Sequence, residues 1–464
     1  MSVSALAEKQ KAARPMTVQV IKTKAEIGFT EDFASVEARL PGGDSVRRLR
    51  REAIGRFASL GLPHRRVEEW KYTDLRNILK EAAPLATGGF DGPTDHIVEE
   101  ALHRALTAGD QGGDWILFSD GKPITANGKL AGADHSLATV LKAPPAWLEA
   151  ELARVSKGDG DGVTALNTAF MTDGLVLDIP DGANWDSPVH AVFYSGGLRD
   201  EDATAQCSIV TRNIIRVGRG AKVTLVESHA NESTRPRHTN AVTQLILGDG
   251  AEVTHVKLTE TNSGETHLAN WIVRLGANAT YRPFQMTAGK GLVRNEMRVT
   301  FEGQHSTFDL GGVSLGSQSG PTDTTLIIDH AVPHCTSREL YKTVLADRAR
   351  GIFQGKVIVR PGAQKTDGKQ MAQALMLSPD AEFDSKPELE IYADDVVCGH
   401  GSTSAEIDED LLFYCRSRGI PPGEARAMLV ESFIGEAIAK VGHEGLNEAL
   451  MTKARAWLAA ASGS

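Results

Sequence analysis

The sequence has few cysteines and no long apolar run. Only four cysteines occur in 464 residues, and none forms a Cys-x-x-Cys pair. We therefore expect neither a disulfide framework nor a self-contained zinc or dithiol redox site. No stretch approaches 18 apolar residues and no apolar signal region stands at the N-terminus. The expected location is the cytoplasm, with no secretion and no membrane span.

Motifs of nucleotide and hydrolytic chemistry are also missing. There is no G-x-x-x-x-G-K-[ST] loop and no H-E-x-x-H, which argues against the enzymes that carry these motifs. The glycines that begin at Gly218 and Gly399 lack the third glycine of a dinucleotide-binding turn. A formal net charge of −10 disfavours a broad nucleic-acid-binding face.

What the chain does contain predicts four segments. Residues 1–40 are expected to be a flexible lead-in, because they lack clear periodicity. Residues 41–165 are expected to form a helical or mixed domain, since apolar residues recur every three to four positions from Asp44 to Leu60. Residues 166–407 are predicted to be a β core. Residues 408–464 are predicted to form a C-terminal helical domain, with Asp408 at the start of its first helix.

The predicted β core contains a repeating turn. Gly-Ala pairs begin at Gly220, Gly250, Gly276 and Gly362, and the first two intervals are 30 and 26 residues. Short β-branched runs lie between them. This period is typical of a solenoid, and short strands with glycine corners favour a parallel β-helix. The alternative is a large sandwich of hairpins, which the scarcity of Asn-Gly and Asp-Gly turns disfavours.

Two polar groups of this segment are candidates for metal binding. Cys398 and His400 are two residues apart after the strand formers Val396 and Val397, so a strand would place both on one face. They could form half of a site for a soft metal or an iron–sulfur fragment, but two ligands do not complete one. A buried cysteine and a structural histidine remain the alternative. The group His330, His334 and Cys335 is interpreted as structural, because Pro333 opposes a helical register.

Several motifs together resemble one family. They are Arg350–Lys356 (RGIFQGK), Pro361–Asp367 (PGAQKTD), Lys386–Val396 (KPELEIYADDV), Cys398–Gly401 (CGHG) and Tyr414–Ile420 (YCRSRGI). In this order they resemble the SufB/SufD family of the SUF iron–sulfur cluster assembly machinery. The segment Glu68–Thr73 (EEWKYT) resembles the SufD members in particular.

The resemblance implies a fold, partners and a site. It implies a right-handed parallel β-helix core with an N-terminal α/β segment and a C-terminal helical domain. It implies a scaffold subunit that is not an enzyme, pairs with SufB and docks the ABC-type ATPase SufC through its C-terminal helices. A transient iron–sulfur cluster would form at the interface with SufB, with His400 as a ligand and Cys398 as a less certain one. The chain itself would bind no nucleotide.

Other functions remain open at this point. The chain could be a purely structural partner of SufB whose Cys398 and His400 never contact metal. A β-helix enzyme that acts on polysaccharide is disfavoured, because no catalytic cluster or secretory signal is apparent. The residues do not decide whether the isolated chain forms a homodimer through the edge it would offer to SufB.

Overall fold

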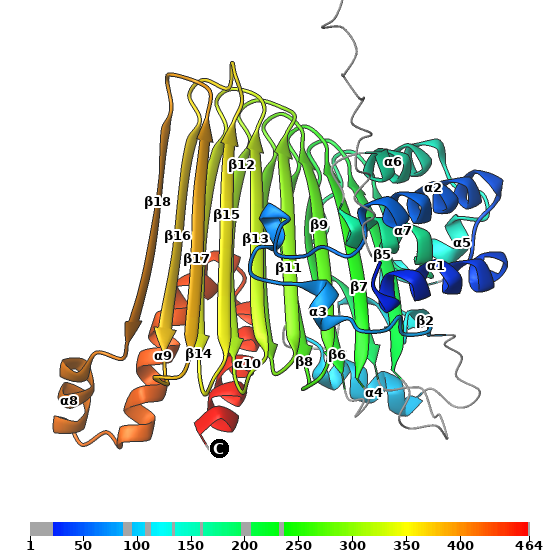
Figure 1. Ribbon diagram of the computed structural model, residues 1–464. Helices are drawn as coiled ribbons and strands as arrows, with labels where there is room; N and C mark the ends of the chain where they lie inside the picture. Colours follow the sequence, from blue (N-terminus) through cyan, green and yellow to red (C-terminus); the bar gives the residue numbers. More distant parts are fainter. Residues whose placement is uncertain are drawn as a thin grey trace, which may run out of the picture.

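The body of the protein consists of two facing sheets (Figure 1). The computed structural model describes residues 22–86, 95–106, 113–131, 135–157, 161–195, 206–231 and 236–462. The ten-stranded sheet has the spatial order β18 (Val397–Glu406), β16 (Asp367–Met376), β14 (Thr336–Leu345), β12 (Thr307–Gly316), β10 (Thr280–Gly289), β8 (Glu252–Thr261), β6 (Lys222–Asn231), β4 (Val189–Ser195), β1 (Asp114–Ser119) and β2 (Lys122–Ala126). The eight-stranded sheet has the order β17 (Glu382–Ile391), β15 (Arg350–Val359), β13 (Pro321–His330), β11 (Leu292–Phe301), β9 (Thr266–Leu275), β7 (Arg237–Leu247), β5 (Cys207–Val217) and β3 (Val176–Ile179).

Successive strands alternate between the two sheets, so that each pair of strands makes one coil. Every strand from β3 to β16 pairs in parallel with the strand one coil further on. Glu252 pairs with Thr280, and Thr280 pairs with Thr307. The prediction of a parallel β-helix is confirmed and the hairpin sandwich is wrong. Most core strands have ten residues. They are longer than the β-branched runs seen in the sequence, because polar residues extend each run.

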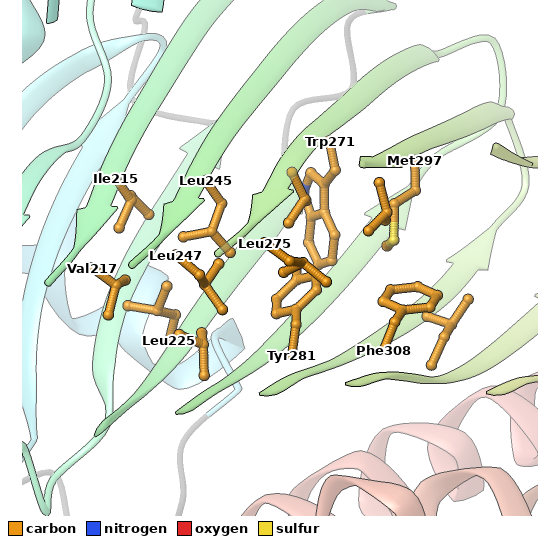
Figure 2. Packing of buried hydrophobic residues seen from close by; sticks show 14 of the residues in the cluster. Ile215, Val217, Leu225, Leu245, Leu247, Trp271, Leu275, Tyr281, Met297 and Phe308 are labelled. Atoms are coloured by element: carbon orange, nitrogen blue, oxygen red, sulfur yellow. The ribbon is translucent and has the colours of Figure 1, made fainter. Parts of the chain in front are cut away.

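The inward side chains of the two sheets form one continuous apolar core (Figure 2). Successive residues of a strand point to opposite faces, so alternate positions face this core. Trp271 and Leu275 of β9 lie near Tyr281 of β10 in this way (Figure 2). The ring of His255 stacks on Trp271 with centroids 4.1 Å apart. Each coil therefore buries its inward residues against the next, as expected of a solenoid.

The corners between strands need left-handed backbone, and glycine provides only part of it. Gly220, Gly250 and Gly362 have φ values of 65°, 70° and 88°, as the repeat predicts. In the third repeat, however, the left-handed residue is Asn278 with φ 55°, not Gly276. Asn tolerates this conformation better than most residues. Gly276 is required for another reason, because a Cβ there would lie 2.7 Å from Oδ1 of Asp249.

The N-terminal part of the chain packs as helices on the outer face of the eight-stranded sheet. Its elements are α1 (Lys24–Val36), η1 (Glu37–Arg39), α2 (Asp44–Leu60), η2 (Glu68–Trp70), α3 (Leu75–Ile78), α4 (Asp95–Arg104), η3 (Gly128–Leu130), α5 (Leu137–Val140), α6 (Ala146–Lys157) and α7 (Gly162–Phe170). Phe57 of α2 and Phe170 of α7 lie in an apolar cluster with Val210 and Ile214 of β5. The helix α4 instead covers β1, β4 and β6 of the ten-stranded sheet.

Two predicted boundaries need correction. The expected flexible lead-in over 1–40 is wrong for 24–40, because α1 begins there with a capping box between Thr23 and Glu26 and buries Phe33. Residues 1–21 lie outside the described residues. The β core does not begin at 166, since α7 continues to Phe170. Conversely, β1 and β2 of the predicted mixed domain extend the ten-stranded sheet.

A short N-terminal segment crosses the outer face of the eight-stranded sheet (Figure 1). The guanidinium of Arg294 lies 3.9 Å from the ring centroid of Trp70. It donates to the backbone oxygen of Glu69 at 2.7 Å and to the carboxylate of Asp323 at 2.6 Å. The Thr73 hydroxyl donates to the same carboxylate. The EEWKYT motif is therefore a clamp between the N-terminal region and the middle coils.

The chain ends in the helices α8 (Glu409–Ser417), α9 (Pro422–Ile438) and α10 (Glu444–Ser462), with η4 (Ala439–Val441) after α9. The predicted start is confirmed, because the Asp408 side chain accepts from the backbone N–H of Asp410 and Leu411. Ile434 of α9 and Leu450 of α10 pack on the outer face of the ten-stranded sheet. None of the described helices is long and apolar enough to cross a membrane.

Candidate functional site

Cys398 and His400 lie on β18, the last strand of the solenoid, as the spacing predicts. Cys398 is in register with Gly368 of β16, and His400 with Gln370. These positions are on the inward face of the sheet, because Tyr341 of β14 and Ala372 of β16, in the next column of the same face, lie in the solenoid core. No further strand of the described residues covers β18, so the two donors sit at the open end of the interior.

The two donors differ in accessibility. His400 is exposed, whereas Cys398 is partly buried. Burial raises the pKa of the Cys398 thiol, and the nearby carboxyl groups of Asp367 and Glu339 raise it further. The thiol form is thus favoured until a cation displaces the proton. His400 is the donor that a second chain could reach directly.

Large apolar side chains are exposed on the surface around them, beside the charged residues and Pro387 of β17. Val397, Tyr392 and Ile391 are 62%, 58% and 42% exposed. Among the described residues, β17 and β18 each pair with a neighbouring strand on one side only. An exposed sheet edge with large apolar side chains is a template for pairing with another chain.

A second exposed apolar surface lies on α8. This helix stands away from the β-helix (Figure 1), and only Leu412 of its residues is buried. Leu411, Phe413 and Tyr414 are 51%, 70% and 56% exposed. Sequence periodicity predicts α8 but cannot distinguish it from α9, which packs on the sheet.

Behind the final coil lies a set of buried polar side chains that sequence reasoning missed. Ser337 and Glu339 of β14 and Gln370 of β16 are 0%, 2% and 3% exposed. None of their side-chain polar atoms has a hydrogen-bond partner among the described groups. The signal was present in the alternation of β14, which puts Glu339 on the same face as Tyr341.

The group at His330, His334 and Cys335 does not form a site. His330 is buried and stacks on Phe301 with centroids 4.4 Å apart. His334 is a corner residue with φ 62° whose ring stacks on His305. The Cys335 thiol donates to the Gly303 carbonyl at 3.4 Å. Within the described ranges no three His, Cys, Asp or Glu side chains could hold a metal ion.

The fold and the uncovered last coil together indicate the class of protein. It is a parallel β-helix clamped by an N-terminal helical region and followed by C-terminal helices, with its last coil and α8 uncovered. Residues 200–433 match the family model of the SufBD core domain of SUF system iron–sulfur cluster assembly. Residues 29–89 and 131–191 match the SufBD N-terminal region. The chain therefore belongs to the SufBD family.

Individual relatives agree with this assignment. An iron–sulfur cluster assembly SufBD family protein of Synechocystis is 30% identical over 438 residues, which are 91% of each chain. The iron–sulfur cluster assembly protein SufD of Escherichia coli is 27% identical over 398 residues, 85% of this chain and 88% of that protein. SufD of Bacillus subtilis is 29% identical over 303 residues, 64% and 67% of the two chains.

Proposed function

We propose that this chain is a SufD-type scaffold subunit of SUF iron–sulfur cluster assembly and performs no catalysis of its own. The observation that carries the proposal is the final coil, where a family motif places an exposed histidine on an uncovered apolar edge. Such an edge suits a partner with the same architecture, whose last coil would continue both sheets. The proposed partner is SufB.

The proposed chemistry is ligation of a nascent cluster by His400, with Cys398 as a secondary donor. Imidazole is a borderline ligand that suits iron, whereas thiolates bind iron–sulfur clusters more firmly. A site with one imidazole among thiolates would hold the cluster less tightly than four thiolates would. That difference favours release of the cluster to an acceptor protein.

The second proposed interface is α8 with the start of α9, which would dock the ATPase SufC. Its support is the exposed apolar surface of Leu411, Phe413 and Tyr414 on a helix held away from the core. Arg418 lies over the Tyr414 ring at 5.1 Å, so a basic group borders this surface. ATP hydrolysis by the partner could then move α8 and α9 relative to the final coil.

Co-expression of this chain with its predicted partners SufB and SufC tests the function. The purified complex would be assayed for iron and sulfide, comparing wild type with His400→Ala and Cys398→Ala. We expect a large loss for His400→Ala and a smaller loss for Cys398→Ala. Ser404→Ala, on the exposed end of the same strand, is the matched control and should change nothing.

The same experiment distinguishes the alternative functions. If both variants form a normal complex with unchanged iron and sulfide, the chain is a structural partner without metal contact. If no complex forms, the final coil does not pair with SufB. Sedimentation of the isolated chain would show whether the uncovered edge pairs with a second copy instead.

A further inference from the structure

The interior of the last coils contains donor groups arranged in register. Glu339, Gln370 and His400 occupy consecutive positions of one inward column. Ser337, Gly368 and Cys398 form the neighbouring column. Adjacent strands of a sheet are about 4.8 Å apart, so each donor lies one coil from the next. The columns lead from the exposed His400 into the closed part of the solenoid.

Glycines make room for these donors. At Gly368, an added Cβ would lie 3.4 Å from the Ser337 hydroxyl and 3.5 Å from the Cys398 sulfur. The hydroxyl and the thiol therefore border the same small space. On the facing sheet, a Cβ at Gly355 would collide with the amide of Gln370. The amide thus lies flat against β15, across the interior.

These polar groups are deeply buried without protein partners. A buried donor or acceptor with no hydrogen bond destabilises the fold by about 1–3 kcal/mol. Both carboxyl oxygens of Glu339 and both polar atoms of the Gln370 amide are in this state. Ser337 stabilises the ionised form of Glu339 but does not reach hydrogen-bonding geometry. Several such groups on the same inward face of neighbouring coils indicate a ligand that would satisfy them.

The donor set identifies the class of ligand. One carboxyl group, one amide oxygen, one hydroxyl and one thiol are all metal donors, and together they suit a divalent first-row cation. Burial raises the pKa of Glu339 to about 8, so the carboxyl group is neutral at neutral pH when no cation is bound. A bound cation would displace the carboxyl proton to solvent, and a coordinating thiol would lose its proton in the same way.

We propose that the last three coils hold an interior site for Fe²⁺ beneath His400, formed by Glu339 of β14, Gln370 of β16 and Cys398 of β18. The site would receive the ion that is later built into the cluster. Only this choice of iron rests on the proposed function; the presence of a cation site does not. Because His, Cys, Asp and Glu alone do not supply three converging ligands among the described residues, the Gln370 amide oxygen is an essential donor.

Anaerobic titration of the full, reduced chain with Co²⁺ or Fe²⁺ alone tests the proposal. We expect one ion per chain and, with Co²⁺, a thiolate-to-metal absorption band. Glu339→Gln and Gln370→Leu should weaken binding at least tenfold, since removing one donor of a metal site has effects of about this size. Cys398→Ser should remove the absorption band. Glu406→Gln, on exposed β18, should bind like wild type.

Two further variants keep the test decisive. Gly355→Ala displaces the Gln370 amide without removing a donor, and should weaken binding while circular dichroism stays unchanged. His400→Ala should retain the interior ion. If His400→Ala abolishes binding and Glu339→Gln does not, the ion occupies the surface pair and the interior site is disproved. Absence of any binding also overturns it, whereas the cluster function is judged separately by iron and sulfide in the assembled complex.

Discussion

The middle coils and the last coil are built from the same repeat, but the middle coils are buried and the last coil is exposed to solvent. In β9 eight of ten residues are buried, and Trp271 is 1% exposed. In β18 none is buried, and Val397 is 62% exposed. The N-terminal end of the solenoid is covered by α4 and the antiparallel strand β2. The C-terminal end has no such cover among the described residues.

This difference shows which parts of the chain serve folding and which serve association. An uncovered strand edge is a liability that proteins usually blunt with charge, proline or a covering element. Here β17 carries Pro387 and several charged side chains, yet the apolar side chains of Ile391 and Val397 remain exposed. The middle coils stabilise the fold, and the last coil is expected to gain its stability from a partner.

The strongest test of the comparison truncates one apolar side chain in each region. Trp271→Ala should lower the free energy of unfolding by about 3–5 kcal/mol, because it leaves a cavity in a packed core. Ile391→Ala should change it by less than about 0.5 kcal/mol. Urea unfolding followed by circular dichroism measures both. Equal losses would mean that the last coil is as tightly integrated as the middle.

The clamp across the middle coils should be nearly as sensitive. Arg294→Ala leaves the buried carboxyl groups of Glu296 and Asp323 without this partner and removes the ring contact with Trp70. We expect a loss of about 3 kcal/mol, since breaking a buried ion pair leaves an uncompensated charge. Arg455→Ala, in an exposed pair of α10, is the control. A loss below 1 kcal/mol for Arg294→Ala would show that the clamp is dispensable.

The interior of the last coils should respond to pH. The pKa of Glu339 is raised from 4.5 to about 8 by burial. Below pH 4.5 the acid is neutral in both states, so its contribution is fully present. As pH rises towards 8 the unfolded chain ionises first, and stability is lost by about 1.4 kcal/mol per unit.

Glu339→Gln stays neutral at every pH and should remove this loss. In metal-free buffer, the free energy of unfolding of Glu339→Gln relative to that of wild type should therefore increase as pH rises from 4.5 to 8. Unfolding curves at several pH values, with Glu406→Gln as the exposed control, measure the gain. Parallel curves for Glu339→Gln and wild type would contradict the buried, neutral state of the acid.

The smallest expected effect on stability concerns α8. Phe413→Ser removes a side chain that is 70% exposed and should change stability by less than about 0.5 kcal/mol. It should nevertheless reduce co-purification with SufC. The ring of Phe433 of α9 lies 4.5 Å from the Lys342 amine on the sheet. Phe433→Ala should therefore lower the free energy of unfolding and leave co-purification with SufC unchanged. Unchanged binding by Phe413→Ser would move the proposed ATPase contact away from α8.

Much of the architecture is local in origin, and for that reason the sequence predicts it. The turn-and-strand repeat indicates a solenoid because each coil contacts only its neighbours. The cap at Asp408 and the glycine after Leu60 mark helix ends through short-range hydrogen bonding. The shared face of Cys398 and His400 follows from the two-residue period of a strand.

Only the tertiary structure determined the contacts between residues that are about 30 or more positions apart in the sequence. The register of β14, β16 and β18 aligns Glu339, Gln370 and His400, and no spacing within one strand indicates this column. The contact of Trp70 with Arg294 joins segments 224 residues apart in the chain. Packing also determined that α9 is buried and α8 is not. The two helices have similar apolar periodicity, but only α9 has a sheet face against which its apolar side chains can pack. Sequence alone thus specified the repeat and its donors, whereas the stacking of the coils determined which donors face the interior and which remain open to a partner.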